Sequence, residues 1–385
     1  DKKKGCIADT LTITSNKWMR AGYGEKTRDF FAKNTNPMLL IDFAGVKIFE
    51  SATVDTNILL FAKAANEHKT WCAVTNKQNK DSVKNLSVFV QQSGTKCEFC
   101  SSDSWVILSP IEQSIKRKIE AVGTPLKDWD IQINYGIKTG YNDAFIIDTA
   151  KRDEILANCQ SEDERERTAE LIRPILRGRD IKRYGYNWAG LYLIATFPSR
   201  HYDIEQYPAV KKYLLSFGIE RLEQTGKVHN VNGEKIKARK KTNNKWFETQ
   251  DSISYWEDFS KPKIVWGNLN LRPSYAIVED NSFINAPSPM IVPASRYLLA
   301  ILNSKLADYF IRQLGVTRNG GYFEYKPMFI EQLPVPQCLD DSILKEINTN
   351  ATIKNEKIID TIVYSLYGLN DEEIQYIEKG TQENY

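Results

Sequence analysis

The first sixty residues alternate between strand-like and helix-like patterns, and this alternation constrains the fold more than any other feature of the chain. Apolar runs at Leu11–Ser15, Leu39–Phe43 and Thr56–Phe61 enclose a basic, helix-like stretch from Arg20 to Lys33. Strand–helix–strand alternation at this spacing is typical of an α/β sheet. No strand, glycine-rich turn and helix precede it, so the usual first βα turn of a nucleotide-type cofactor site is missing. We therefore expect the chain to be the later part of a longer enzyme.

Size and composition indicate a globular protein of several domains. With 385 residues, 42% of them apolar and 26% charged, the chain can bury two or three cores. No apolar stretch is long enough to cross a bilayer, so we expect no membrane partner and a cytoplasmic location. We also expect a monomer. The six cysteines are irregularly spaced, which indicates a reducing compartment. Cys97 and Cys100 form a CxxC without a second pair, so a plain turn is favoured over zinc and no metal is expected.

The residue pattern changes along the chain and predicts four segments. Residues 1–95 are the α/β part, closed by a strand at Leu86–Val90, and residues 96–130 are a linker with a connecting helix at Ile111–Val122. Residues 131–337 carry short β-branched runs with inserted helices, which indicates a mixed α+β, mostly β domain. Residues 338–385 are predicted to form a helical hairpin, with a first helix at Ile343–Gly368 and a second, short helix at Asp371–Lys379. The predicted helices of the third segment are Asp163–Leu171, Tyr207–Glu223 and Ser295–Ile311.

Three groups of residues together resemble one family. Residues 13–61, with the strings ITSNKWMRAGYGEKTRDFF and LLIDFAGVKIFESATVDTNILLF, resemble the later motifs of gamma-class adenine-N6 DNA methyltransferases. Residues 133–147 with 171–184, and 297–310 with 320–336, resemble the TaqI-like target-recognition domain of type IIG restriction–modification enzymes. The C-terminal string IVYSLYGLNDEEIQYIE is similar to the end of such enzymes. The resemblance implies the end of a Rossmann-like methyltransferase sheet, then a DNA-specificity domain and a helical tail. The partner that it implies is double-stranded DNA.

The chain departs from this family where the chemistry takes place. Family members bind S-adenosylmethionine through a glycine-rich loop and act through an Asn-Pro-Pro-Tyr/Phe tetrapeptide, and neither occurs in this sequence. Asn36-Pro37 is followed by Met38, so it cannot replace the tetrapeptide. We therefore expect this fragment to be inactive alone, with S-adenosylmethionine bound by the methyltransferase N-terminal half of the same parent chain. A nuclease domain of the parent, also outside this fragment, would use Mg²⁺.

The resemblance also implies a role for one aromatic residue. Phe49 matches the family position whose ring stacks on the adenine rotated out of the duplex, since a methyltransferase cannot reach N6 inside the helix. The alternative is a core phenylalanine at a strand edge. We therefore predict that Phe49 stacks on the flipped base.

Basic and amide side chains in loops are the predicted DNA contacts. Residues 227–245 carry seven lysines and arginines against one acid, Glu234, although the whole chain has a net charge of only +3. Asn and Gln read adenine edges, Arg reads guanine, and Lys mostly contacts phosphate. The loop at Gly136–Asn142 has two glycines that allow close approach, although a purely structural role is favoured for most of it. The predicted contacts are Lys138, Tyr141, Asn142, Arg239, Lys240, Lys241, Asn243, Asn244, Lys245, Trp246, Asn268, Asn270, Arg272, Arg318 and Asn319.

Two alternatives remain open at this point. The chain can be a stand-alone, non-enzymatic specificity subunit that docks on a separate methyltransferase and nuclease, or a β-rich protein-interaction domain. For Arg177 and Asp180, pairing inside the domain is favoured over a DNA contact. The three histidines are scattered, and none is assigned a catalytic role.

Overall fold

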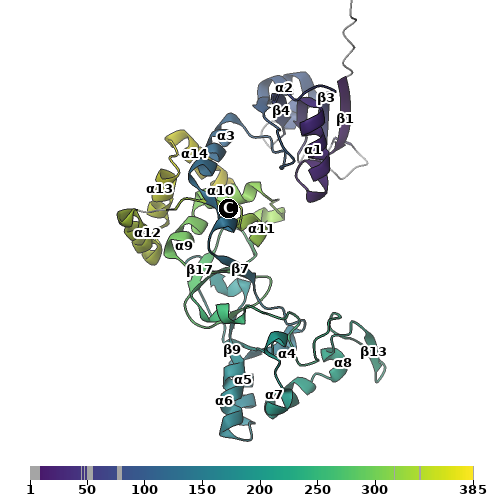
Figure 1. Cartoon of the computed structure of the whole chain (residues 1–385), viewed down its shortest axis with the longest axis vertical. Helices are drawn as coiled ribbons and strands as arrows, with labels where there is room; N and C mark the ends of the chain where they lie inside the picture. Colours follow the sequence, from purple (N-terminus) through teal and green to yellow (C-terminus); the bar gives the residue numbers. More distant parts are fainter. Residues whose placement is uncertain are drawn as a thin grey trace, which may run out of the picture. The chain divides into compact units, whose positions relative to one another are not determined.

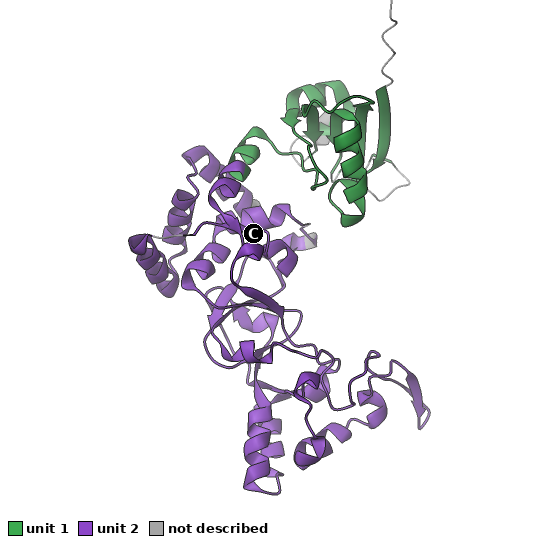
Figure 2. Ribbon diagram, viewed as in Figure 1, with its two compact units in different colours: residues 1–116 green, residues 117–385 purple. Residues whose placement is uncertain are grey.

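The computed structural model describes residues 9–44, 46, 48, 49, 55–75, 80–315, 317–337 and 340–384. The chain divides into two compact units, Asp1–Lys116 and Arg117–Tyr385 (Figure 2). The division falls inside helix α3 (Pro110–Val122), which confirms the helix predicted at Ile111–Val122. The segment boundaries at residues 95, 130 and 337 stay predictions.

The first unit is built on a five-stranded sheet in the order β1-β3-β2-β4-β5 (Figure 1). Strands β2 and β4 are parallel, and the other neighbours are antiparallel. Leu40 packs in one apolar cluster with Ala32 of α1, while Ile41 packs in another with Phe89 of α2, so helices cover both faces of the sheet. The elements are β1 (Asp9–Ser15), α1 (Glu25–Asn34), β2 (Asn36–Asp42), β3 (Thr56–Ala62), β4 (Thr70–Val74), α2 (Leu86–Ser93) and β5 (Thr95–Cys97).

The strand predicted at Leu86–Val90 is wrong, because this segment is helix α2. The side chain of Asn85 accepts a hydrogen bond from the backbone amide of Val88 at 3.2 Å and caps the helix. Phe89 is fully buried, whereas Leu86 and Val88 are exposed. The local cap and one buried aromatic ring outweigh the β preference of the apolar run.

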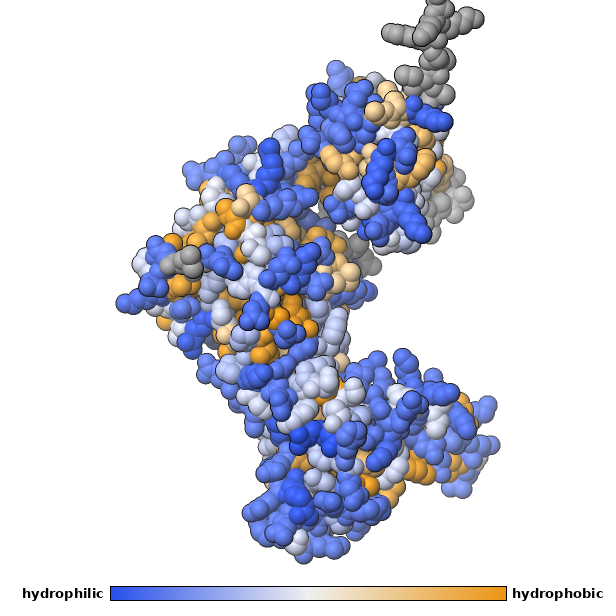
Figure 3. Space-filling model, viewed as in Figure 1, coloured by the Kyte–Doolittle hydropathy of each residue, from blue (hydrophilic) through white to orange (hydrophobic). Residues whose placement is uncertain are grey.

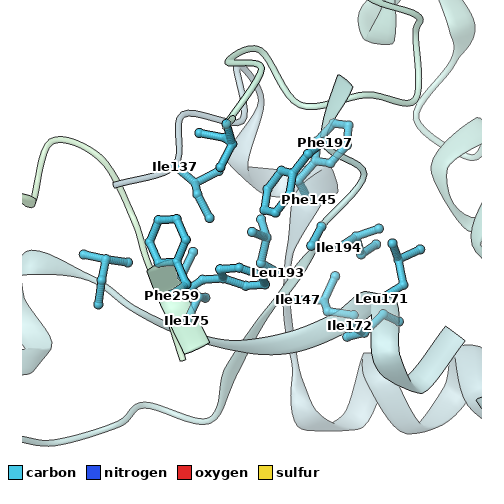
Figure 4. Packing of buried hydrophobic residues seen from close by; sticks show 14 of the residues in the cluster. Ile137, Phe145, Ile147, Leu171, Ile172, Ile175, Leu193, Ile194, Phe197 and Phe259 are labelled. Atoms are coloured by element: carbon cyan, nitrogen blue, oxygen red, sulfur yellow. The ribbon is translucent and has the colours of Figure 1, made fainter. Parts of the chain in front are cut away.

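The second unit contains two four-stranded sheets, β18-β9-β12-β8 and β17-β15-β19-β7, and several two-stranded pairs. An apolar cluster that includes Ile137, Phe145, Leu193 and Phe259 fills the space between their elements (Figure 4). The strands are β6 (Thr124–Pro125), β7 (Gln132–Tyr135), β8 (Ile146–Asp148), β9 (Ile172–Leu176), β10 (Ile181–Lys182), β11 (Gly185–Tyr186), β12 (Leu191–Ile194), β13 (Val228–Val231), β14 (Glu234–Lys237), β15 (Lys263–Trp266), β16 (Leu269–Asn270), β17 (Tyr275–Val278), β18 (Phe283–Ile284), β19 (Pro289–Val292), β20 (Phe323–Glu324) and β21 (Pro334–Val335).

The helices of the second unit lie between these strands and after the last of them. They are α4 (Asn142–Phe145), α5 (Thr149–Ala157), α6 (Glu162–Leu171), α7 (Pro208–Leu215), α8 (Ile219–Leu222), α9 (Arg296–Asn303), α10 (Lys305–Gln313), α11 (Pro327–Ile330), α12 (Asp341–Ile353), α13 (Glu356–Leu366) and α14 (Asp371–Asn384). The architecture is therefore mixed α/β, with several small sheets and a C-terminal helical segment. In the part of the chain that the structure describes, no helix is long and apolar enough to span a membrane.

Three predicted helical segments need correction. The helix expected at Tyr207–Glu223 is broken at Gly218, whose φ of +84° ends one helix and starts the next. The helix expected at Ser295–Ile311 is broken at Ser304, whose hydroxyl accepts a hydrogen bond from Ala307 and caps α10. The first tail helix, expected at Ile343–Gly368, is two helices, α12 and α13, and the second, α14, extends to Asn384 rather than Lys379.

Candidate nucleic-acid interface

Arg239 is the centre of the loop assembly that carries most of the predicted contacts. Its Nε atom donates a hydrogen bond to the carbonyl oxygen of Leu222 at 2.8 Å. Its Nη1 atom donates to the carbonyls of Thr139 and Glu248 at 2.9 and 2.8 Å, and Nη2 donates to that of Trp246 at 2.6 Å. These carbonyls belong to three segments, namely the end of α8, the loop at Thr139 and the loop at Trp246–Glu248, so one guanidinium joins all three.

The prediction that Arg239 contacts DNA is wrong, because its side chain is only 4% exposed. Burial lowers the pKa of Arg239 to about 10, partly offset by the nearby carboxylate of Glu248. The guanidinium also lies 5.0 Å from the ring centre of Phe145 in the core. Its donors are directed at backbone carbonyls, which need a partner when buried. Arg239 therefore stabilises the conformation of these loops through hydrogen bonds made inside the domain.

The residues around Arg239 point outward. Lys138 lies on the loop that Arg239 joins through Thr139, and its carbonyl accepts a hydrogen bond from the amide of Gln250 at 3.1 Å. Burial raises the pKa of the Asp251 carboxyl, and the charges of Lys138 and Lys240 act on it in the opposite direction. Two segments a hundred residues apart thus present one exposed surface. We call it the basic loop surface: Lys138, Lys240, Lys241, Asn243 and Lys245.

Other predicted contacts in these loops are engaged within the domain. The Tyr141 ring lies edge-on to Phe217 at 5.7 Å, and the side chain of Asn142 accepts a hydrogen bond from the Thr139 hydroxyl at 2.7 Å. The amide of Asn244 donates to the carbonyls of Thr249 and Gln250. Half-buried Trp246 packs against the core cluster. These four side chains fix the loop conformation. Their direct contact with DNA stays a prediction.

A second group of predicted residues is brought together by pairing of β16 with β20. The register places Leu269 opposite Glu324 and Asn270 opposite Phe323. The loop that carries Asn268 and Arg272 therefore lies beside the loop that carries Arg318. Sequence alone treats these loops as separate clusters.

Arg312 supports these two loops from within, as Arg239 supports the basic loop surface. It donates to the carbonyl of Leu271 and, at 3.4 Å, to that of Gly321, and it forms an ion pair with Asp308 at 3.0 Å. The hydroxyl of Tyr325 donates to the same carboxylate at 2.7 Å. Sequence reasoning missed this residue. The spacing of four between an acid and a base on an amphipathic helix is the signal that could have found it.

The exposed charges of this second group are partly neutralised. Arg318 pairs with Glu324 at 2.5 Å, and Lys326 pairs with the same residue at 2.7 Å. Asn270 donates its amide to the carbonyl of Gly267 at 2.8 Å, while Arg272 is exposed. The side chain of Asn319 lies outside the described residues. The positive charge of this group is therefore weaker than that of the basic loop surface.

Phe49 lies in the connection between β2 and β3 of the first unit. Its side chain is 45% exposed, so it is not a core residue. The stacking role of Phe49 stays a prediction.

Asp42 is a buried acid at the end of β2. Its carboxylate accepts a hydrogen bond from the amide of Asn16 at 2.7 Å. Burial raises the pKa of Asp42.

The dipeptide Asn36-Pro37, which the sequence sets against the family tetrapeptide, is part of the sheet of the first unit. Asn36 and Pro37 lie within strand β2, where the side chain of Asn36 accepts a hydrogen bond from Glu67 and the carbonyl of Pro37 accepts one from Thr70. Both are thus engaged in the sheet, away from any loop that could present a ligand. Across the described ranges, no group of three or more His, Cys, Asp or Glu side chains could hold a metal ion.

One strong local feature was also missed from the sequence. Residues 228–237 form the hairpin β13–β14, whose turn is Asn232-Gly233. An Asn-Gly pair between alternating residues is a strong hairpin signal. The predicted Arg177–Asp180 pairing, in contrast, is confirmed by hydrogen bonds of 3.0 and 2.8 Å.

Comparison with known proteins assigns the region that holds the second loop group and all of the basic loop surface except Lys138. Residues 173–335 match the family described as the TaqI-like C-terminal specificity domain. The chain therefore carries such a specificity domain, which includes Arg239, Arg312 and the hairpin β13–β14.

The relatives in sequence are type II methyltransferases. The chain is 22% identical to M.BstVI of Geobacillus stearothermophilus over 95% of its own length and 65% of that protein. It is 20% identical to M.PaeR7I of Pseudomonas aeruginosa over 94% of its length and 61% of that protein. It is also 22% identical to RM.Eco57I of Escherichia coli, a type II restriction enzyme and methyltransferase, of which it spans 36%. The chain thus covers less than two thirds of these relatives.

A solved structure shares the fold. The type IIL restriction-modification enzyme MmeI, solved in complex with DNA, matches 98% of this chain and 50% of its own, with a TM-score of 0.51. Since the two are only 11% identical, this likeness concerns the fold alone.

Proposed function

We propose that this chain selects the DNA site for a restriction–modification enzyme that transfers a methyl group from S-adenosylmethionine to adenine N6. The observation that carries this proposal is the specificity-domain match at residues 173–335. The similarity of the chain to type II methyltransferases supports it. The first unit would then be the end of a Rossmann-like methyltransferase domain, and Phe49 would stack on the flipped adenine.

The arrangement of the loops supports duplex binding. Lysines on the basic loop surface are exposed, whereas the arginine among them is buried and holds the loops in place. Exposed lysines neutralise phosphates and release counterions, which supplies affinity without sequence information. In Figure 3 the surface over α8 and β13 is drawn mainly in hydrophilic colours. A polar, positively charged surface on stiff loops suits the DNA backbone.

The methyl donor and any nuclease metal would be bound by residues outside this chain. This chain's part would then be to bind and orient the duplex. Cleavage as a second activity is proposed from the relative RM.Eco57I, whose name states both activities. Mg²⁺ would serve that second activity.

The test is a methylation assay with the protein expressed from its complete gene. Random-sequence duplex DNA and radiolabelled S-adenosylmethionine are supplied, and modified bases are separated chromatographically. The expected product is N6-methyladenine at one sequence. Site-specific binding without methyl transfer would instead support a stand-alone specificity subunit. If the protein neither binds duplex DNA nor methylates it, the proposed function is wrong.

A further inference from the structure

The hairpin β13–β14 extends beside α8 in the second unit and has two different faces (Figure 1). Its register pairs Val228 with Lys237, His229 with Ile236, Asn230 with Lys235 and Val231 with Glu234. In an antiparallel ribbon, directly paired residues share a face and the next pair lies on the opposite one. One face therefore contains His229, Ile236, Val231 and Glu234. The outer face contains Val228, Asn230, Lys235 and Lys237.

Burial separates the two faces in the same way. His229, Val231 and Ile236 are half-buried, and the His229 Nε2 atom lies 3.4 Å from a carboxylate oxygen of Glu223. All four residues of the outer face are exposed, and Val228 is 61% exposed. Within the described part of the chain, the side-chain amide of Asn230 makes no hydrogen bond. The outer face thus presents two cations, a free amide and an apolar side chain.

The base of the hairpin is anchored to the buried Arg239. The amide of Ala238 donates to the carbonyl of Lys227 at 2.9 Å, and that of Gly226 donates to the carbonyl of Arg239 at 2.8 Å. The amide of Arg239 donates to the carbonyl of Glu223 at 2.9 Å. The backbone of Arg239, the residue whose guanidinium joins the loops of the basic loop surface, therefore also anchors the base of the hairpin. A ribbon held at its base can present side chains in a defined orientation.

We propose that the outer face of β13–β14 enters the major groove and that Asn230 reads a base edge there. The groove is about 12 Å wide and admits a two-stranded ribbon. A free carboxamide can pair with the N6 and N7 atoms of adenine, and an exposed valine can contact the methyl group of thymine. Lys235 and Lys237 then neutralise phosphates at the rim of the groove. This inference rests on the proposed function and names the element that determines its specificity.

Charge favours DNA over a protein partner as the occupant of this face. Between Lys227 and Lys241 the only acidic residue is Glu234, and the register puts it on the other face. The outer face therefore carries positive charge with no acidic side chain to offset it. A duplex provides the matching negative charge along both sides of the groove.

The test is selection of preferred sequences from a random duplex library by the protein expressed from its complete gene. Asn230→Ala is expected to reduce discrimination at one A·T base pair by about 5-fold to 150-fold while overall affinity changes little. Lys235→Ala with Lys237→Ala is expected to weaken binding to all sequences alike. Asn187→Ala, at an exposed asparagine between β11 and β12, serves as the matched control and should leave the preferred sequence unchanged.

The outcomes separate this inference from the proposed function. If the unaltered protein selects a sequence and Asn230→Ala selects the same one with equal discrimination, the hairpin does not read bases, although the proposed function stands. If the unaltered protein selects no sequence at all, both are wrong. Circular dichroism of each variant shows that it is folded, because these exposed side chains contribute little to stability.

Discussion

At the residue scale, burial divides the cations of the second unit into two kinds. Arg239 and Arg312 donate to backbone carbonyls of several loops, while the lysines around Arg239 remain exposed. A planar guanidinium with five donors can satisfy several carbonyls at once, which an ammonium cannot do with the same geometry. The sequence showed that residues 227–245 are basic but could not show which cation is buried, because that depends on carbonyls that are distant along the chain.

The structural role of Arg239 predicts a large loss of stability on its replacement. Arg239→Met should lower the free energy of unfolding by more than about 3 kcal/mol, because several buried carbonyls lose their partner. Lys240→Met, at the exposed neighbour, should change it by less than about 0.5 kcal/mol. Urea denaturation followed by circular dichroism measures both. Equal stability of the two variants would show that Arg239 does not support the loops.

Phe49 gives a second prediction at this scale. In the protein expressed from its complete gene, Phe49→Ala should slow methyl transfer by about 5-fold to 150-fold, since stacking contributes about 1–3 kcal/mol per base. Affinity for duplex DNA should change less. Phe30→Ala, at a phenylalanine on α1 that is 53% exposed, is the control and should leave the rate unchanged. A rate equal to that of the control would argue against stacking by Phe49.

At the element scale, the sequence predicted which segments are helical better than it predicted where they break. Helix α3 was expected from apolar spacing and is present, because the spacing is a local property. The breaks at Gly218 and Ser304 were missed, since a glycine or a serine is tolerated inside many helices. The segment at Leu86 was assigned as a strand because its apolar run did not show which side chain would be buried. Pairing of β16 with β20 joins segments more than fifty residues apart, and a local pattern does not reveal such a contact.

The break between α7 and α8 depends on the backbone conformation of Gly218, which gives a prediction about stability. Its φ of +84° with ψ of 134° lies in a region that residues with a Cβ atom rarely adopt. Gly218→Ala should therefore cost about 1–3 kcal/mol in the free energy of unfolding. The control is Gly380→Ala in the middle of α14, where nothing lies within 4 Å of the added carbon. That substitution should be neutral or stabilise by up to about 1 kcal/mol. Thermal denaturation that ranks the two variants in the reverse order would contradict this account.

At the scale of the whole molecule, the position of the charged side chains indicates a nucleic-acid partner better than the net charge does. The net charge of +3 is too small to indicate a nucleic-acid partner. However, exposed lysines of the hairpin and of the segment after Arg239 lie in the region that matches the specificity domain, and Lys138 lies on a loop that Arg239 joins to that region. Each lysine that neutralises a phosphate releases counterions, so the number engaged can be read from the salt dependence of binding.

This clustering predicts the salt dependence of duplex affinity. Seven exposed lysines lie on the basic loop surface, on strand β14 of the hairpin or directly before strand β13. They are Lys138, Lys227, Lys235, Lys237, Lys240, Lys241 and Lys245. If all of them contact phosphate, a plot of log affinity against log salt should have a slope of about −6, at roughly 0.9 per phosphate. Replacing Lys240 and Lys241 with alanine should make that slope shallower by about 1.8. Fluorescence anisotropy with a labelled duplex measures it.

Lys345 and Lys357 are the matched control, because they are equally exposed but lie on α12 and α13, outside the specificity domain. Their replacement with alanine removes the same net charge, so a purely global effect of charge would change the slope as much as the first pair does. A local interface predicts no change for this second pair, since charges further apart than about 10 Å at 0.1 M salt are largely screened. Equal slopes for the two double variants would therefore contradict a local interface at Lys240 and Lys241.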